Sequence, residues 1–489
     1  MLGAAPLPAQ TAVNPGSWSG GLVPVVITDA RAQAAANTSV STDPYALVGL
    51  RRSLPWLGGI VGSGNSNFAT NGVGINGPLI NSQAANGSLG GGSSLFGGGS
   101  GLLGNGPSFF TRSPWFGGGR LFPGVYSRVN SRLWFTGEWL LWDTKGMETP
   151  ALVTSSTTGT PRDTAAVLGE DGSSVLFGNQ QINGGTVSGL RIAGGFWLTP
   201  QQDLGIEAEY FRLSEQDARF NGNSDGSVIL GRPFFDIVAG QETAQLVSFP
   251  GLVSGGINID TRTNLRSVMI NGRAALCPSS GACCNQCGIP DRVDWIVGFR
   301  HTQLDDTITI NESLNSLVAA APGTIELVDR FRTTNDFNGL QLGIVHRANF
   351  RRAYIESMLR IAVGNNQQTV QINGNNTITE AGLTDVLEGG LLAQRTNIGS
   401  HKRDKFSMIP EVGVRLGWRL SERLSAKIGY SVIYFPNVVR AGDQIDTDLN
   451  PGLVPPEIIP FSGALRPGFS FVESDYWAHG LTLGGELAF

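Results

Sequence analysis

The chain has 489 residues, of which 15% are charged and 68 are glycine, and its formal net charge is −5. Ordinary soluble domains carry roughly 25% charged residues and about half this share of glycine, so the composition argues against a series of such domains. The negative charge excludes the basic surface of a nucleic-acid-binding protein. No run of 18 apolar residues occurs, which excludes a membrane-spanning helix and leaves an all-β chain, either soluble or a membrane barrel.

The first quarter of the chain has no pattern of secondary structure. Residues 1–12 are small and apolar, as at the end of a signal peptide, although a positive segment is missing; a plain disordered tail is the alternative. Residues 13–130 are rich in Gly, Asn and Ser and cannot bury enough apolar surface to fold, so we expect a flexible extension. Its last part, residues 107–130, carries spaced aromatic residues and is expected to dock on another surface.

From residue 131 to the end, ten segments alternate apolar and polar residues with a period of two. Because side chains alternate across a strand, each segment has one apolar and one polar face. Two of the ten, 258–276 and 325–348, alternate less cleanly than the others. The segments lie at about 132–141, 190–198, 206–210, 258–276, 292–300, 325–348, 355–363, 411–419, 424–432 and 477–489.

The links between these segments differ in length in a regular way. Links after the odd-numbered segments are long, at about 143–184, 214–257, 308–324, 375–403 and 437–475, whereas those at 199–203, 347–352 and 421–423 are short, and 277–290 is of middling length. Short turns on one side and long loops on the other are typical of an outer-membrane barrel. Aromatic residues near both ends of the segments agree with the two belts of a membrane interface.

These patterns predict a single transmembrane, antiparallel, up-and-down β-barrel over residues 131–489, with about ten strands and twelve as the alternative. We expect the barrel to lie in the bacterial outer membrane, in contact with outer-membrane lipid. A homo-oligomer is possible. The last residue, Phe489, ends an amphipathic strand and resembles the signal that the barrel-assembly machinery binds.

Four stretches carry a resemblance to a known family: Leu133–Trp142, Arg292–Arg300 running into Leu304-Asp305-Asp306, Phe331–Gly343, and Trp477–Gly484. With them, residues 131–489 resemble the bacterial outer-membrane proteins called putative beta-barrel porin, type seven. The resemblance implies a pore, and it brings no catalytic or substrate-binding residues with it.

Inward-facing charges suggest a largely closed lumen. An unpaired buried charge costs several kcal/mol, so opposite charges in a narrow ten-stranded barrel are expected to pair, leaving at most a narrow pore. A wider barrel in which the charges line water is the alternative. The predicted network comprises Arg132, Glu138, Arg191, Glu207, Glu209, Arg266, Arg292, Asp294, Arg300, Glu356, Arg360, Glu411, Arg415, Lys427 and Glu486.

All four cysteines fall within one link, as Cys277, Cys283, Cys284 and Cys287. Four ligands within eleven residues, two of them adjacent, fit tetrahedral zinc poorly. In an oxidising compartment, two local disulfides of unknown pairing are the favoured interpretation.

A second motif resembles a calcium loop, because Asp446, Asp448, Asn450 and Glu457 have the spacing of four EF-hand ligands. Pro451 occupies the position that requires glycine, and flanking helices are missing. A polar loop tip is therefore the expected role, with no metal and no cofactor.

No nucleophile motif accompanies the few acid and histidine side chains that could meet near the outer rim, Asp305, Asp306 and His479. We therefore expect no enzyme. The predicted function is passive passage of small solutes through a porin-like barrel, or a largely closed structural barrel. Surface recognition through the long outer loops is the alternative.

Overall fold

A computed structural model describes residues 131–277, 291–460 and 462–489, and the chain in these ranges is mainly β-structure. The predicted signal remnant (1–12), the extension (13–130) and Cys283, Cys284 and Cys287 lie outside the described residues. The helical turns in the described ranges are η2 (Gly442–Gln444) and η3 (Pro451–Leu453), and no helix there is long and apolar enough to cross a membrane.

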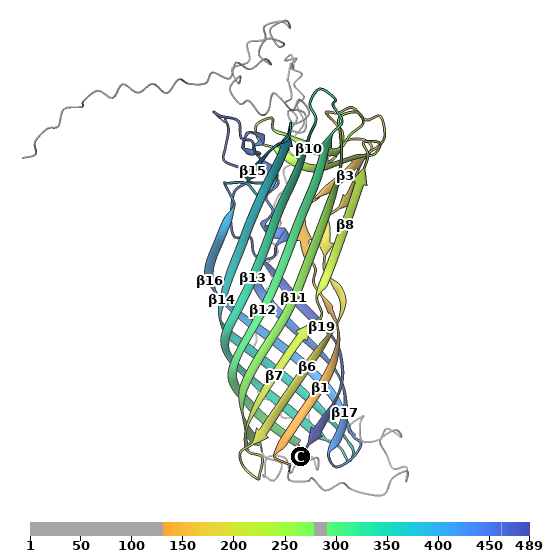
Figure 1. Ribbon diagram of the computed structural model, residues 1–489. Coiled ribbons are helices and arrows are strands. Elements are labelled where there is room, and N and C mark those ends of the chain that lie inside the picture. The colour runs from red at the N-terminus through yellow and green to blue at the C-terminus, as the bar shows by residue number, and fades with distance from the viewer. Residues whose placement is uncertain (1–130, 278–290, 461) are drawn as a thin grey trace, which may run out of the picture. The chain divides into compact units, whose positions relative to one another are not determined.

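Ten antiparallel strands of the described chain close into one barrel, which confirms the predicted fold (Figure 1). Pairing of β1 with β19 joins the first strand to the last, and pairing of β11 with β12 completes the ring. The strands, in barrel order along the chain, are β1 (Leu133–Thr144), β6 (Gly185–Trp197), β7 (Leu204–Leu213), β11 (Val253–Cys277), β12 (Asp291–Ser316), β13 (Gly323–Asn349), β14 (Ala353–Glu380), β16 (Gly399–Arg419), β17 (Leu424–Val438) and β19 (Ser474–Ala488).

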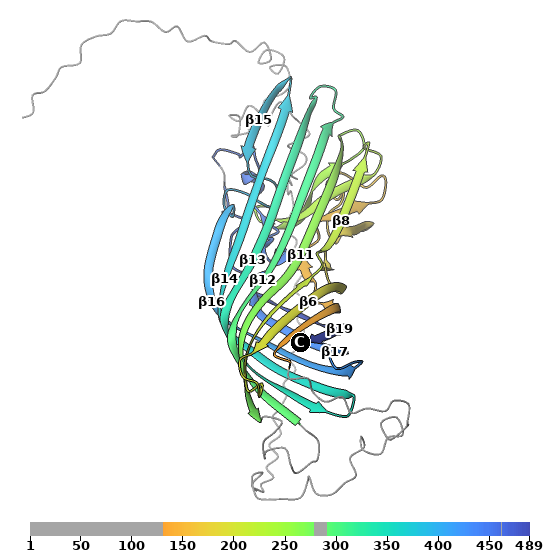
Figure 2. The same cartoon turned by 60° about the horizontal axis from the view of Figure 1, so that its bottom comes forward.

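Five of these strands are much longer than the membrane requires. β11 to β14 and β16 have 21 to 28 residues and rise beyond the shorter β1, β6, β17 and β19 (Figure 2). A barrel strand needs about 9–11 residues to cross a bilayer. Two further strands extend this tall wall: β8 (Gln216–Ser224) pairs with β11 above β7, and β15 (Leu383–Glu388) pairs with β14.

The polarity of the wall inverts partway along these long strands. In the lower part of β12, the outward side chains Trp295, Val297 and Phe299 are exposed and apolar. Higher on the same strand the inward side chains Ile308 and Ile310 are fully buried, and the outward ones are polar. Because β12 pairs with β13 without a register shift, the same face changes from apolar to polar. The membrane band of β12 therefore ends near Phe299.

Above this band, the predicted long loops fold into a second layer inside the wall. β3 (Val153–Ser156), β4 (Ser173–Phe177), β9 (Ile229–Asp236), β10 (Gln241–Ser248) and β18 (Asp448–Leu449) form a five-stranded sheet, and β2 (Met147–Thr149) pairs with β5 (Gln180–Ile182). This sheet and the upper inner faces of β11 to β14 share one apolar core that includes Leu246, Val247, Ile259, Ile310 and Phe331. We call this layer together with the tall wall the head.

The head corrects the sequence-based picture of the links. The link predicted at 308–324 shortens to 317–322, because β12 and β13 continue through most of it. The links predicted at 143–184 and 214–257 contain seven of the additional strands and the start of β11. Alternation predicted these segments poorly because their apolar residues face the head core rather than lipid.

Candidate functional site: the closed lumen

Charged side chains from all ten barrel strands meet inside the membrane band. Each member forms an ion pair with at least one other member, and the pairs join into one continuous network of eight basic and seven acidic groups. We call it the lumen network. Its members are Glu138, Arg191, Glu207, Glu209, Arg273, Arg292, Asp294, Arg300, Arg347, Glu356, Arg360, Glu411, Arg415, Lys427 and Glu486.

Arg191 on β6 connects the centre of this network. Its guanidinium lies 3.2 Å from a carboxylate oxygen of Glu209 and 3.2 Å from one of Glu411, and 3.7 Å from Glu138. Glu411 also accepts a hydrogen bond from Arg300 Nη1 at 2.8 Å. Glu411 and Arg300 are both 0% exposed, so no water-filled channel reaches them within the described part of the chain.

The lower end of the network is closed by ion pairs combined with aromatic rings. Arg292 lies 2.8 Å from Asp294 and places its guanidinium 4.3 Å from the Trp197 ring centre. Arg347 lies 2.5 Å from Glu356 and 4.4 Å from the ring centre of Tyr354. A cation held over an aromatic face gains about 0.5–2 kcal/mol while the ring excludes water. These contacts cover the side of the lumen where the short links lie.

The structure places thirteen of the fifteen predicted network residues in this cluster and two elsewhere. Arg132 precedes β1 and is exposed, and Arg266 is exposed on the outer face of β11, where it bonds Gln303. The network instead contains Arg273 and Arg347, which the sequence pattern did not predict. Arg266 was expected to face inward because both faces of β11 carry apolar residues: Leu265 and Met269 face inward, and Val268 and Ile270 face outward. Alternation therefore could not show which face of this strand lines the lumen. Arg347 lies on β13, which continues into the link expected at 347–352.

An apolar layer lies inside the barrel, between the lumen network and the head. Trp142, Phe211, Phe337, Phe435 and Tyr476 are buried in one cluster with aliphatic neighbours. The Trp142 ring centre lies 5.2 Å from the Arg191 guanidinium carbon, so the two layers are in contact. Apolar groups packed in this way offer no polar path for ions or hydrated solutes.

Above the apolar layer, residues 436–440 cross the barrel and form what we call the strap. Asn335 on β13 donates to the carbonyl of Val439 and accepts from its backbone N–H, both at 2.8 Å. Gln368 on β14 donates to the carbonyl of Asn437 at 2.6 Å. Arg440 donates to Asp306 on β12, and both side chains are nearly inaccessible. The strap is thereby fixed to three strands of the wall.

Removing the carboxylate that holds the strap should loosen it. We expect Asp306→Asn to lower the free energy of unfolding by about 1.5–3 kcal/mol, because a charge-assisted bond to buried Arg440 is lost. Hydrogen exchange of the strap amides should accelerate while exchange in β1 and β19 stays slow. Asp305→Asn is the control, since Asp305 lies on the outer side and bonds Thr334 and Gln303. Equal exchange rates in both variants would contradict the role of Asp306.

The three side chains considered for a rim hydrolase do not meet. Asp306 points inward and pairs with Arg440, whereas Asp305 points outward from β12. His479 lies on β19, where it bonds the Tyr430 hydroxyl at 2.6 Å and stacks on Trp477. Each of the three therefore has a separate structural partner.

Three of the four predicted calcium ligands have other side-chain partners. Asp446 accepts hydrogen bonds from Arg466 at 2.8 Å and from the backbone of Gly468 at 2.7 Å. Glu457 pairs with Arg395 at 2.5 Å, and buried Asn450 caps the turn η3. Asp448 pairs through its backbone with β9. No group of three or more acidic, histidine or cysteine side chains suited to a metal occurs in the described ranges.

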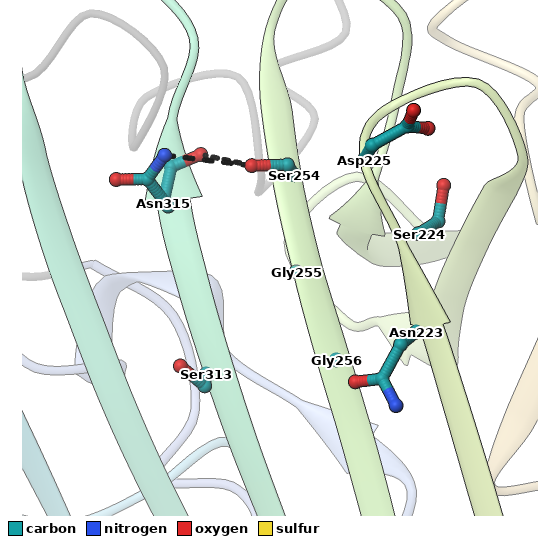
Figure 3. A pocket seen from close by; sticks show the side chains of 8 residues that line it. All are labelled: Asn223, Ser224, Asp225, Ser254, Gly255, Gly256, Ser313 and Asn315. Atoms are coloured by element: carbon teal, nitrogen blue, oxygen red, sulfur yellow. Dashed lines mark hydrogen bonds between the residues drawn. The ribbon is translucent and has the colours of Figure 1, made fainter.

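A shallow hollow of about 440 Å³ opens near the upper end of the wall, where β8, β11 and β12 run side by side (Figure 3). Gly255 and Gly256 leave its floor without side chains, and Ser254 bonds Asn315 across the strands. Its lining contains one carboxylate, Asp225, and no aromatic ring. The hollow therefore lacks the buried polar groups of an enclosed ligand site.

The fold and lumen define this chain as a transmembrane β-barrel whose interior is filled with paired charges. A family model described as "Putative beta barrel porin-7" matches residues 134–489, and the chain belongs to this family. The family predicted from the sequence is thereby confirmed.

Solved structures with a similar arrangement are remote. They include the outer membrane protease OmpT of Escherichia coli (9% identity, 74% of this chain, 98% of that chain, TM-score 0.33). The transport unit of the E. coli autotransporter AIDA-I follows at 8% identity, with 76% and 94% covered and a TM-score of 0.21. A mutant of the TodX monoaromatic hydrocarbon channel of Pseudomonas putida is 10% identical and covers 73% of this chain and 91% of its own, with a TM-score of 0.20. No curated protein matches the chain.

Proposed function

We propose that this protein is a closed barrel of the bacterial outer membrane, which anchors a folded head at the cell surface and does not conduct ions. The observation that carries the proposal is the lumen network, to which every barrel strand contributes and in which Glu411 and Arg300 are inaccessible to water. A conducting porin keeps water in contact with its lumen charges.

The proposal also places the barrel in the outer membrane with its head on the outer side. The outward apolar band suits a bilayer, and the short links 198–203, 350–352 and 420–423 lie at the end opposite the head. Short turns of such barrels face the periplasm, so the head would face outside. Phe489 is exposed at the periplasmic end, where it would be available to the assembly machinery.

Hydrolytic activity is not part of the proposal, because Asp305, Asp306 and His479 each have separate partners. Small-solute passage is disfavoured by the apolar layer and the strap, which lie one above the other over the lumen network.

Recording from planar lipid bilayers tests the closed lumen directly. We expect the full-length protein, inserted at a density checked by gel, to give no steady openings on the nanosiemens scale. A general porin reconstituted in the same way provides the positive control. Steady openings of that size would contradict the proposal and restore passive passage as the function.

A further inference from the structure

Three neighbouring strands carry nitrogen-bearing side chains just above the membrane band. Along the outward faces of β7, β11 and β12, the first polar residue beyond the apolar stretch is Arg212, Arg266 and His301, respectively. β7, β11 and β12 lie next to one another in the barrel (Figure 1). The residues immediately below them on the same faces are Tyr210, Val268 and Phe299.

The strand register brings these side chains together. Arg212 pairs directly with Arg266 across β7 and β11, which places their Cβ atoms about 4.5–5.5 Å apart. His301 pairs with Val268, two residues along β11 from Arg266, so it lies on the adjacent diagonal. Both arginines are exposed, and both face outward.

The two arginines lack a carboxylate partner. In the described part of the chain neither forms an ion pair, and Arg266 donates to the neutral Gln303 Oε1 at 3.1 and 2.5 Å. Higher on the wall, Arg219 lies 3.1 Å from Asp217 and Arg262 lies 3.8 Å from Glu215. Like charges directly opposite each other destabilise a sheet, so an external anion at this position would be favourable.

We propose that Arg212 and Arg266 bind the phosphate of a lipid headgroup in the outer leaflet. His301 lies beside them and keeps its own partners, because its Nδ1 lies 3.3 Å from Asp336 Oδ1 and 3.0 Å from Asn338 Oδ1. The site lies where the apolar band ends, which is the depth of the headgroups, and the outward Val268 and Ile270 below it would contact the acyl chains. Guanidinium groups bind phosphate oxygens through two parallel hydrogen bonds, and paired arginines can hold one phosphate between them. The inference rests on the outward apolar band and on the proposed orientation in the outer membrane, and not on the closed lumen.

Binding of lipid A to the full-length protein in maltoside micelles tests the site, measured by native mass spectrometry across a concentration series. We expect the protein to bind diphosphoryl lipid A, and the double variant Arg212→Gln/Arg266→Gln to bind it at least about tenfold more weakly. Dephosphorylated lipid A should not distinguish the two proteins. Arg262→Gln is the matched control, because it removes an outward β11 arginine that already has a carboxylate partner.

Two further measurements separate the possible results. Arg212→Lys/Arg266→Lys keeps both charges and should bind with intermediate affinity, while the unboiled gel mobility of every variant reports whether the barrel is folded. Equal affinity of the folded wild-type and glutamine variants for diphosphoryl lipid A would overturn the proposal. Complete displacement of the lipid by millimolar inorganic phosphate would also overturn it, since the site would then bind free anions rather than a lipid.

Discussion

Replacing Glu411 with glutamine is expected to lower the free energy of unfolding by about 3–5 kcal/mol, because it removes a buried charge partner. Arg300 has no other carboxylate within ion-pair distance in the described structure and keeps only its bond to Thr302 at 3.0 Å. Glutamine fills the same volume, so the cost reports the unpaired charge rather than a cavity. Urea-induced unfolding in lipid vesicles, followed by tryptophan fluorescence, measures the change.

Two variants show whether the loss comes from the buried charge. Glu326→Gln removes an exposed, outward carboxylate of the head and should change stability by less than about 0.5 kcal/mol. The double variant Glu411→Gln/Arg300→Met removes the unpaired cation as well and should recover most of the loss. A water-filled lumen would solvate Arg300 and make Glu411→Gln as mild as the surface control, which would refute the closed network.

The barrel could be predicted from the sequence because its lower strands alternate against lipid. Trp139 and Leu141 face outward while Glu138 and Leu140 face inward, and this contrast identifies β1 without any knowledge of its neighbours. The same contrast located most of the lumen charges, since an inward Arg or Glu stands out between apolar neighbours. Pairing itself was inferred from the cost of isolated buried charges, not from any local signal.

The head could not be predicted in the same way, because its pattern depends on distant segments. On β12, Ile308 and Ile310 alternate with Thr307 and Thr309, as in a lipid-facing strand, but the apolar side faces inward into the core of the head. Sequence alternation shows that one face is buried and cannot show whether lipid or protein covers it. The burial of the loop residue Arg440 against Asp306 could not be predicted from the sequence for the same reason, because the two residues are 134 positions apart.

Replacing Arg232 with methionine is expected to destabilise the head by about 3–5 kcal/mol at neutral pH. Arg232 on β9 pairs with Glu312 on β12 and lies 2.8 Å from Asp329 on β13, and all three side chains are at most 1% exposed. The arginine therefore links the inner sheet of the head to its wall. Its loss leaves two carboxylates in an apolar core, and hydrogen exchange in β9 and β10 should accelerate.

Acid should restore part of this loss, and the sign follows from Glu312, which lies above the membrane band. Burial raises the pKa of Glu312 above its ordinary value even beside Arg232. Without the arginine, the folded variant binds a proton that the unfolded chain releases, so its stability rises as the pH falls from 7.5 to 5. Asp329 accepts hydrogen bonds from the backbone N–H groups of Leu392 and Ala393, so its carboxylate keeps partners when the arginine is removed.

Arg330, which follows Asp329 on β13, provides the control for this pH effect. Arg330 is exposed and points outward, so Arg330→Met should change stability by less than about 0.5 kcal/mol and leave its pH dependence as in the wild type. Unfolding of both variants in urea at pH 5 and 7.5 gives the comparison. If Arg232→Met lost the same stability at both pH values, the cost would come from packing alone, and the ion pair would not be what holds the head to the wall.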